Sequence, residues 1–148
     1  MRSMFMLLGR ICLSLIFLLS AFNKIFNWDA SHQYLQAQMS DWIQAAVHFP
    51  QIQSIVEQLI PYSSLLLLIA TLFEGIGGLS LILDVQARLG AILLVLFLIP
   101  ATLMMHAFWW VKGQAYELQM IMFLKNLSIL GGLFIFLSGE HGASRTSE

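Results

Sequence analysis

Charged side chains are scarce in this sequence and make up only 10% of its 148 residues. A soluble domain carries about 25% charged residues, so this chain lacks the polar surface that a water-soluble protein needs. Seven Lys and Arg residues against eight Asp and Glu residues give a formal net charge of −1. Such a balance provides no basic patch for phosphates, which argues against nucleic acid as a partner.

Cysteine occurs once, as Cys12. A single cysteine excludes an internal disulfide, a CxxC redox pair and a zinc cluster of thiolates. The four histidines have no close metal-ligand spacing, so no metal site is predicted. The sequence predicts no intrinsic cofactor. In a redox reaction, a bound cofactor or a partner protein would have to carry the electrons.

Hydrophobic residues are abundant, at 59% of the chain, and they gather in four long runs. About 20 apolar residues cross a bilayer as a helix, so each run predicts one span. The predicted fold class is all-α, a polytopic membrane protein whose four transmembrane helices form a bundle and a single domain over residues 1–148. The predicted spans are residues 4–22, 61–83, 87–107 and 118–137.

The connection at residues 23–60 is the only long one. It mixes apolar and polar residues at helical spacing, which predicts short amphipathic helices in this first outer loop. These helices are expected to lie on the outer membrane face or to cover the bundle. The tail at residues 139–148 is small and polar and is predicted to be disordered.

The positions of Lys and Arg near the span ends predict the orientation. With the N-terminus inside, the basic residues favour a topology in which both termini are cytoplasmic. A cleaved signal peptide is the alternative for the first run, but Arg10 interrupts the run and no A-x-A-like site follows. The inner flanks would hold Arg2, Arg10, Arg88 and Arg145, and the outer flanks Lys24 and Lys112.

Two ionisable residues fall within the predicted spans, with Glu74 near mid-membrane and Lys125 in the outer half. An ionisable group in hydrocarbon costs from about 2.5 kcal/mol upward and is usually functional. Glu74 and Lys125 are therefore the candidate catalytic residues. An ion pair of Glu74 with Arg10 or with Lys125 is within reach along the helix axes.

Further polar residues near the outer ends of the spans predict a ligand-binding cluster. His106 is equally well explained as an interfacial residue, and a structural explanation is favoured for Lys24, Asp84 and Arg88. Lys24, Asp84 and Arg88 lie near span ends, where a charged side chain can reach the membrane surface. The candidate ligand-binding residues are Arg10, Lys24, His106 and Asn126.

Several short motifs occur along this sequence. They are Gly9-Arg10, the segment from Ile16 to Lys24, Glu74-x-x-Gly77-Gly78-Leu79, Arg88, Phe108-Trp109, and the most specific block, Phe123-Leu124-Lys125-Asn126-Leu127 with Gly131-Gly132-Leu133. These motifs resemble those of the DoxX family. The resemblance extends from about residue 9 to residue 137, and Ala21 and Asp84 depart from it where the family often has glycine.

The resemblance implies a small bacterial inner-membrane protein with four spans. The family is named after subunits of a thiosulfate–quinone oxidoreductase, which suggests a component of a quinone-linked oxidoreductase system. Quinone would then be the ligand of a polar intramembrane pocket. Lys125, Asn126 and His106 could donate hydrogen bonds to it, and Glu74 could relay protons. A redox partner protein would exchange the electrons, and whether the chain is itself an enzyme stays open.

The alternative is a non-enzymatic membrane module that binds a lipid or another amphiphile, or that scaffolds a partner complex. The same polar pocket would then hold a headgroup, and the glycines would allow close helix packing. A proton-coupled transporter is disfavoured because four spans without an inverted repeat are few for alternating access. A homo-oligomer of two copies could supply eight spans.

Overall fold

The computed structural model describes residues 2–139, with side chains for residues 4–138. Within these limits all regular structure is helical and no strand occurs, so the predicted all-α class is confirmed. Four helices are long and apolar enough to cross a membrane, as predicted. They are α1 (Arg2–Phe26), α4 (Ser63–Leu83), α5 (Ala87–Met105) and α6 (Gln114–Gly139).

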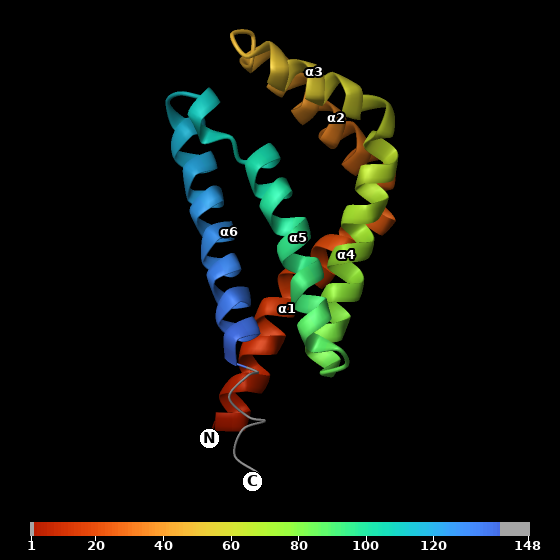
Figure 1. Ribbon diagram of the computed structural model, residues 1–148, viewed down its shortest axis with the longest axis vertical. Coiled ribbons are helices and arrows are strands. Elements are labelled where there is room, and N and C mark those ends of the chain that lie inside the picture. Colours follow the sequence, from red (N-terminus) through yellow and green to blue (C-terminus); the bar gives the residue numbers. More distant parts are fainter. Residues whose placement is uncertain (1, 140–148) are drawn as a thin grey trace.

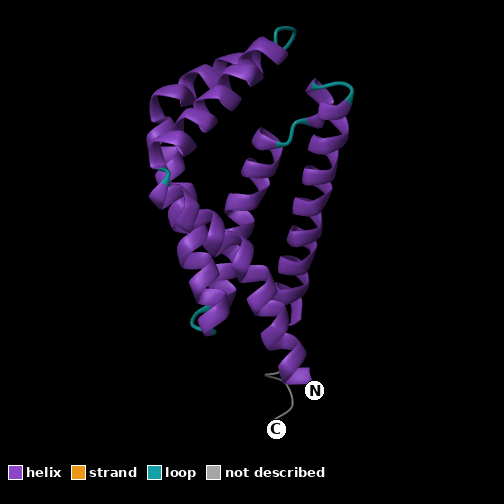
Figure 2. Ribbon diagram, turned by 180° about the vertical axis from the view of Figure 1, so that it is seen from behind, coloured by secondary structure: helices purple, strands orange, loops and turns teal. Residues whose placement is uncertain are grey.

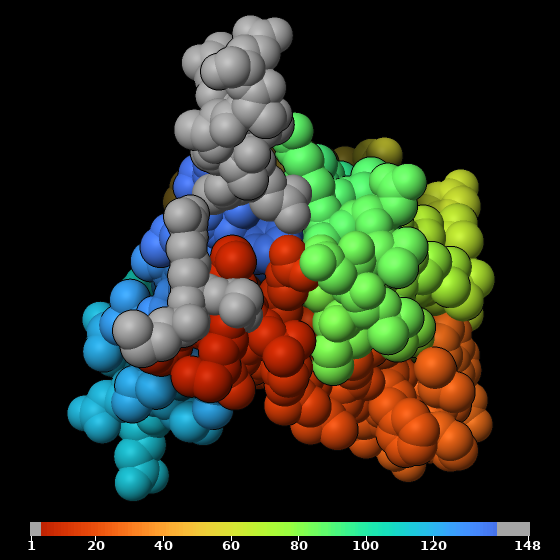
Figure 3. Space-filling model, turned by 90° about the horizontal axis from the view of Figure 1, so that it is seen from below, coloured from red at the N-terminus to blue at the C-terminus, as the bar shows by residue number. Residues whose placement is uncertain are grey.

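The four long helices run alternately up and down (Figure 1). Helix α4 packs against both α1 and α5, and α6 packs mainly against α5. Helix α1 begins and α6 ends at the same end of the bundle, here called the terminal end. Seen from below, the start of α1 lies between the end of α6 and the turn that joins α4 to α5 (Figure 3).

The opposite end carries a helical hairpin and is here called the hairpin end (Figures 1 and 2). The predicted helices of the first loop are present, but the first of them is not short, because α2 has 18 residues. The hairpin leads directly into α4. Its elements are α2 (Trp28–Ala45), α3 (Pro50–Leu59) and the 3-10 turn η1 (Ile60–Tyr62).

The hairpin is fixed to the bundle by apolar packing and by side-chain hydrogen bonds. The Trp42 indole donates to the Met104 carbonyl at 2.8 Å, and His32 Nε2 lies 2.8 Å from Ser63 Oγ. The hairpin therefore covers the ends of α4 and α5. Its apolar contacts centre on Leu35, Met39, Val56 and Leu67.

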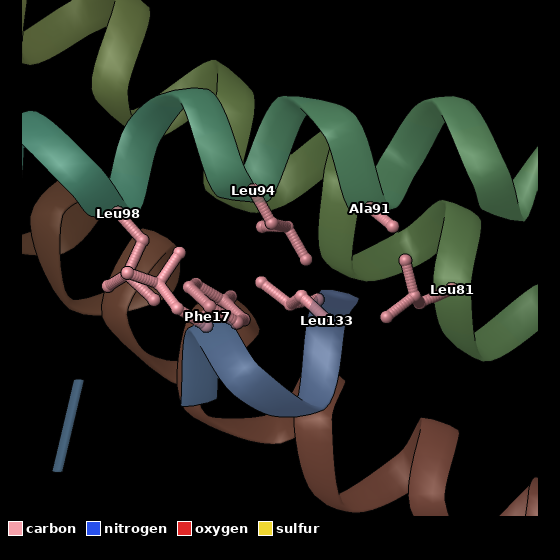
Figure 4. Packing of buried hydrophobic residues seen from close by; sticks show 7 residues of the cluster. Phe17, Leu81, Ala91, Leu94, Leu98 and Leu133 are labelled. Carbon is pink, nitrogen blue, oxygen red and sulfur yellow. The ribbon is translucent and has the colours of Figure 1, made fainter. Parts of the chain in front are cut away.

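In the main core, buried side chains from all four long helices lie together (Figure 4). Glycines let α4 and α5 approach closely, because a Cβ at Gly90 would lie 2.9 Å from the Gly77 carbonyl oxygen. Such small-residue contacts replace the hydrophobic effect as the source of helix packing in lipid. The buried core residues are Phe17, Leu81, Ala91, Leu94, Leu98, Leu130 and Leu133.

The outer surface of the long helices is apolar. Large side chains such as Leu19, Leu96 and Ile135 are more than half exposed, which suits helices surrounded by lipid. Residues 106–113 join α5 to α6 and contain the 3-10 turn η2 (Phe108–Trp110). The tail predicted to be disordered, residues 139–148, lies outside the described residues except for Gly139, which ends α6.

Candidate functional site

A buried ion pair joins α1 to α4. Lys24 Nζ donates hydrogen bonds to Glu74 Oε2 and to Ser20 Oγ, both at 2.6 Å. Glu74 is only 1% exposed, so this carboxylate does not reach solvent or lipid. The pair lies deep in the bundle, as the sequence predicted for Glu74.

Lys24 reaches Glu74 from one helical turn nearer the hairpin end. A Cβ on Gly75 would lie 3.9 Å from the Ala21 Cβ, which sets these two residues at the same level. Side chains in a helix lean toward its N-terminus, so Lys24 leans down into the bundle. The expected explanation, a charge that reaches the membrane surface, is therefore wrong for Lys24.

An aromatic ring also lies beside the ammonium group. Lys24 Nζ lies 5.7 Å from the centre of the Phe97 ring on α5, within the range of a cation–π contact. Phe97 in turn packs edge-to-face on Phe17 at 6.3 Å. The Lys24 ammonium therefore contacts groups from three helices. They are a hydroxyl of α1, a carboxylate of α4 and an aromatic ring of α5.

The ion pair lies in the wall of a cavity of about 590 Å³. This volume is within the range of about 300–1,000 Å³ that is usual for small-molecule sites. The cavity extends from the level of Glu74 to His106 at the hairpin end, and α2, α3 and all four long helices line it. Its walls are mostly apolar and include Ile16, Leu66, Phe73, Leu96, Ala101 and Met104.

His106 and Asn126 also line this cavity, and each joins α5 to α6. His106 Nδ1 lies 2.8 Å from Gln119 Oε1. Asn126 Nδ2 donates to Thr102 Oγ1 at 3.1 Å, and the Thr102 hydroxyl donates to the Leu98 carbonyl at 2.6 Å. These two predicted ligand-binding residues therefore share a cavity with Lys24 and Glu74.

Lys125 is not part of this group. Its side chain is on the exposed face of α6, where Nζ lies 3.3 Å from Met122 Sδ. Successive residues in a helix point about 100° apart, so Asn126 faces the bundle while Lys125 faces outward. The expected Glu74–Lys125 pair and the place of Lys125 in the polar cluster are therefore wrong.

Arg10 is also remote from Glu74 and forms a salt bridge with Asp84 at the terminal end. Its guanidinium lies 5.3 Å from the centre of the Phe136 ring. Ala21 is level with Gly75, so Arg10 is eleven residues, or about 17 Å, below the level of Glu74. The expected Glu74–Arg10 pair is therefore wrong.

The sequence analysis missed two residues of the site, Ser20 and Phe97. Ser20 carries a signal that could have been used, because it lies four residues before Lys24 and therefore on the same helix face. Phe97 carries none, because an aromatic residue in an apolar span is indistinguishable from its lipid-facing neighbours until the packing is known.

Comparison with known proteins agrees with this architecture. The sequence model of the DoxX family matches residues 5–107, from α1 to the end of α5. The chain is 25% identical over 142 residues to the Inner membrane protein YphA of Escherichia coli (strain K12), and the match covers 96% of this chain and 87% of that protein. No solved structure matches. With its four long apolar helices, this chain is a multi-pass inner-membrane protein and belongs to the DoxX family.

Proposed function

We propose that this protein is a quinone-binding component of an inner-membrane oxidoreductase system. The observation that carries the proposal is the buried Lys24–Glu74 pair, which opens on a cavity of about 590 Å³ with mostly apolar walls. A quinone combines a weakly polar ring with an apolar tail. It would match the pair at one end of the cavity and the apolar walls along the rest.

The donors at the pair suit a quinone carbonyl. An ammonium group has three N–H donors, and Ser20 and Glu74 accept two of those of Lys24. The third is available to a ligand carbonyl. Phe97, which lies beside Lys24 Nζ and lines the cavity, would give the quinone ring an apolar contact.

The depth of the pair favours a quinone over a phospholipid. Glu74 is eleven residues into α4, which is about 17 Å along the helix from its hairpin end. A phosphate headgroup would have to leave the membrane surface to reach it, at the cost of burying a charge. A neutral ring has no such cost. The alternative, a lipid-binding module, is supported by the apolar walls alone.

When bound, a quinone takes up two electrons and two protons. The chain's own residues act on the protons, since Glu74 has a carboxylate at the site and His106 lines the other end of the cavity. A redox partner protein would exchange the electrons with the quinone.

We also propose that both termini face the cytoplasm. Arg10 and Arg88 lie at the terminal end, and Lys112 lies at the hairpin end. Lys24 points into the bundle and does not count as a charge at the hairpin end. The excess of basic residues at the terminal end is therefore larger than the sequence suggested, which supports a cytoplasmic terminal end.

The test is the quinone content of protein extracted gently from its own membrane. Wild-type protein is expected to retain quinone, and Lys24→Met together with Glu74→Gln is expected to lose it. Lys112→Met is the control, because Lys112 is exposed, does not line the cavity and is not part of the ion pair. A phospholipid in place of quinone in the wild type would support the lipid-binding alternative.

A further inference from the structure

A second cavity, of about 400 Å³, lies at the hairpin end. It is bounded by α2 on one side and by η2 and the start of α6 on the other. Met104 and Met105 line both this cavity and the larger one. The second cavity therefore lies next to the first and is separated from it by two flexible side chains.

Indole rings form one corner of this second cavity. The ring centres of Trp42 and Trp110 are 5.9 Å apart and the planes meet at 80°. Trp109 also packs on Trp42, with ring centres 6.2 Å apart and planes at 81°. The hydrogen bond from Trp42 to the Met104 carbonyl fixes the orientation of its ring. Indole faces carry negative electrostatic potential, and two at right angles form part of a cage for a cation.

Among the residues that line this cavity, Asp41 is the only charged one. The sequence has no Lys or Arg between residues 25 and 87, so no cation on α2, α3 or α4 competes for Asp41. Lys112 follows Val111 of the lining but is exposed and does not itself line the cavity.

We propose that this second cavity binds an organic ammonium group. The Trp42 and Trp110 rings would contact its alkyl substituents, and the Asp41 carboxylate would balance its charge. The amide oxygens of Gln38 and Gln44 supply further acceptors. A soluble amine and an ethanolamine lipid headgroup share this chemistry. The inference does not depend on quinone binding in the larger cavity.

The experiment uses purified full-length protein in phosphatidylglycerol nanodiscs, which contain no amine headgroup. Tetramethylammonium chloride is titrated against sodium chloride while tryptophan fluorescence is recorded, since three of the four tryptophans lie at this corner. Saturable quenching is expected. Asp41→Asn should weaken the binding roughly tenfold or more. Trp110→Leu should weaken it as well.

Two matched controls separate a site from general surface charge. Glu57→Gln removes the same charge from the same hairpin outside the cavity, and it should leave the affinity unchanged. Choline should bind at least tenfold more tightly than its neutral isostere 3,3-dimethyl-1-butanol. The proposal is overturned by quenching that does not saturate, by equal effects of Asp41→Asn and Glu57→Gln, or by equal affinity for choline and its isostere.

A repeat in phosphatidylethanolamine nanodiscs identifies the source of the ammonium group. If lipid headgroups occupy the cavity, the apparent affinity for tetramethylammonium should fall through competition. An unchanged affinity would indicate a soluble amine. Both results uphold the ammonium site, and neither bears on quinone content, which is measured separately.

Discussion

The Lys24–Glu74 pair makes a quantitative prediction about stability that can be tested by a double-mutant cycle. Lys24→Met leaves the Glu74 carboxylate, whose side chain is 2% exposed, without its counter-ion. Glu74→Gln leaves the Lys24 ammonium, which is 19% exposed and keeps Ser20 as an acceptor. Lys24→Met leaves the buried Glu74 carboxylate unpaired. Glu74→Gln leaves unpaired a charge that is partly exposed to the cavity, so Lys24→Met should be the more damaging change.

Removing one partner of a buried ion pair costs about 3–5 kcal/mol. We expect Lys24→Met to lower the free energy of unfolding by about 4–5 kcal/mol and Glu74→Gln by about 3 kcal/mol. The double variant has no buried charge, and replacing a whole pair is often close to neutral, so its loss should be about 1 kcal/mol. The two changes should therefore couple by several kcal/mol, far beyond the additivity of independent sites.

The assay is reversible unfolding in mixed micelles of dodecyl maltoside and sodium dodecyl sulfate, followed by helical circular dichroism. Single losses below about 0.5 kcal/mol, or a double variant that loses the sum of the two, would refute a buried, mutually compensating pair. The double variant also serves the functional test. If it folds and still lacks quinone, the loss reports on the binding site and not on stability.

Three further predictions concern positions elsewhere in the bundle. Gly90→Ala should destabilise the protein by about 1–3 kcal/mol through overpacking, since the new Cβ would meet an α4 carbonyl oxygen at 2.9 Å; Gly131→Ala, with nothing within 4 Å, is the control for unfolding in micelles. Asp84→Asn should cost at most about 1 kcal/mol, because Asp84 is 61% exposed in its salt bridge with Arg10; a larger loss in the same assay would mean that the bridge is shielded from solvent. Lys125→Met should leave the quinone content at the wild-type value, since Lys125 lies outside the cavity, and quinone loss on mass spectrometry would contradict that assignment.

The four long helices were predictable because lipid imposes a strong constraint on sequence. A span must bury about 20 consecutive residues in hydrocarbon, and the four apolar runs satisfy this without further information. The hairpin was harder to predict. Leu35 and Met39 of α2 are buried by contacts with α3 and α4, so the full length of α2 depends on tertiary packing that a helical pattern alone does not contain.

The partners of the charged residues were not predictable from helical periodicity. A helical wheel gives the face on which Glu74 lies, but not which helix packs against that face. The structure packs α1 against the length of α4, so Lys24 meets Glu74 while Arg10 meets Asp84. The expected pairs of Glu74 with Arg10 and with Lys125 were wrong because both depend on which helices are neighbours and on their relative depth. Only the assembled bundle defines these two properties.

The different orientations of Lys24 and Lys125 nevertheless follow from a rule that can be applied to the sequence alone. Side chains in a helix lean toward its N-terminus, and the four spans alternate in direction. Lys24 is near the C-terminal end of α1, so its lean carries the ammonium away from the nearer membrane surface, onto Ser20 and Glu74. Lys125 is in the half of α6 nearer its N-terminus, so the same lean carries it toward the nearer surface, beside Met122. A lysine near the C-terminal end of a span therefore needs a buried partner more often than one near the N-terminal end, and helix direction is as informative as depth.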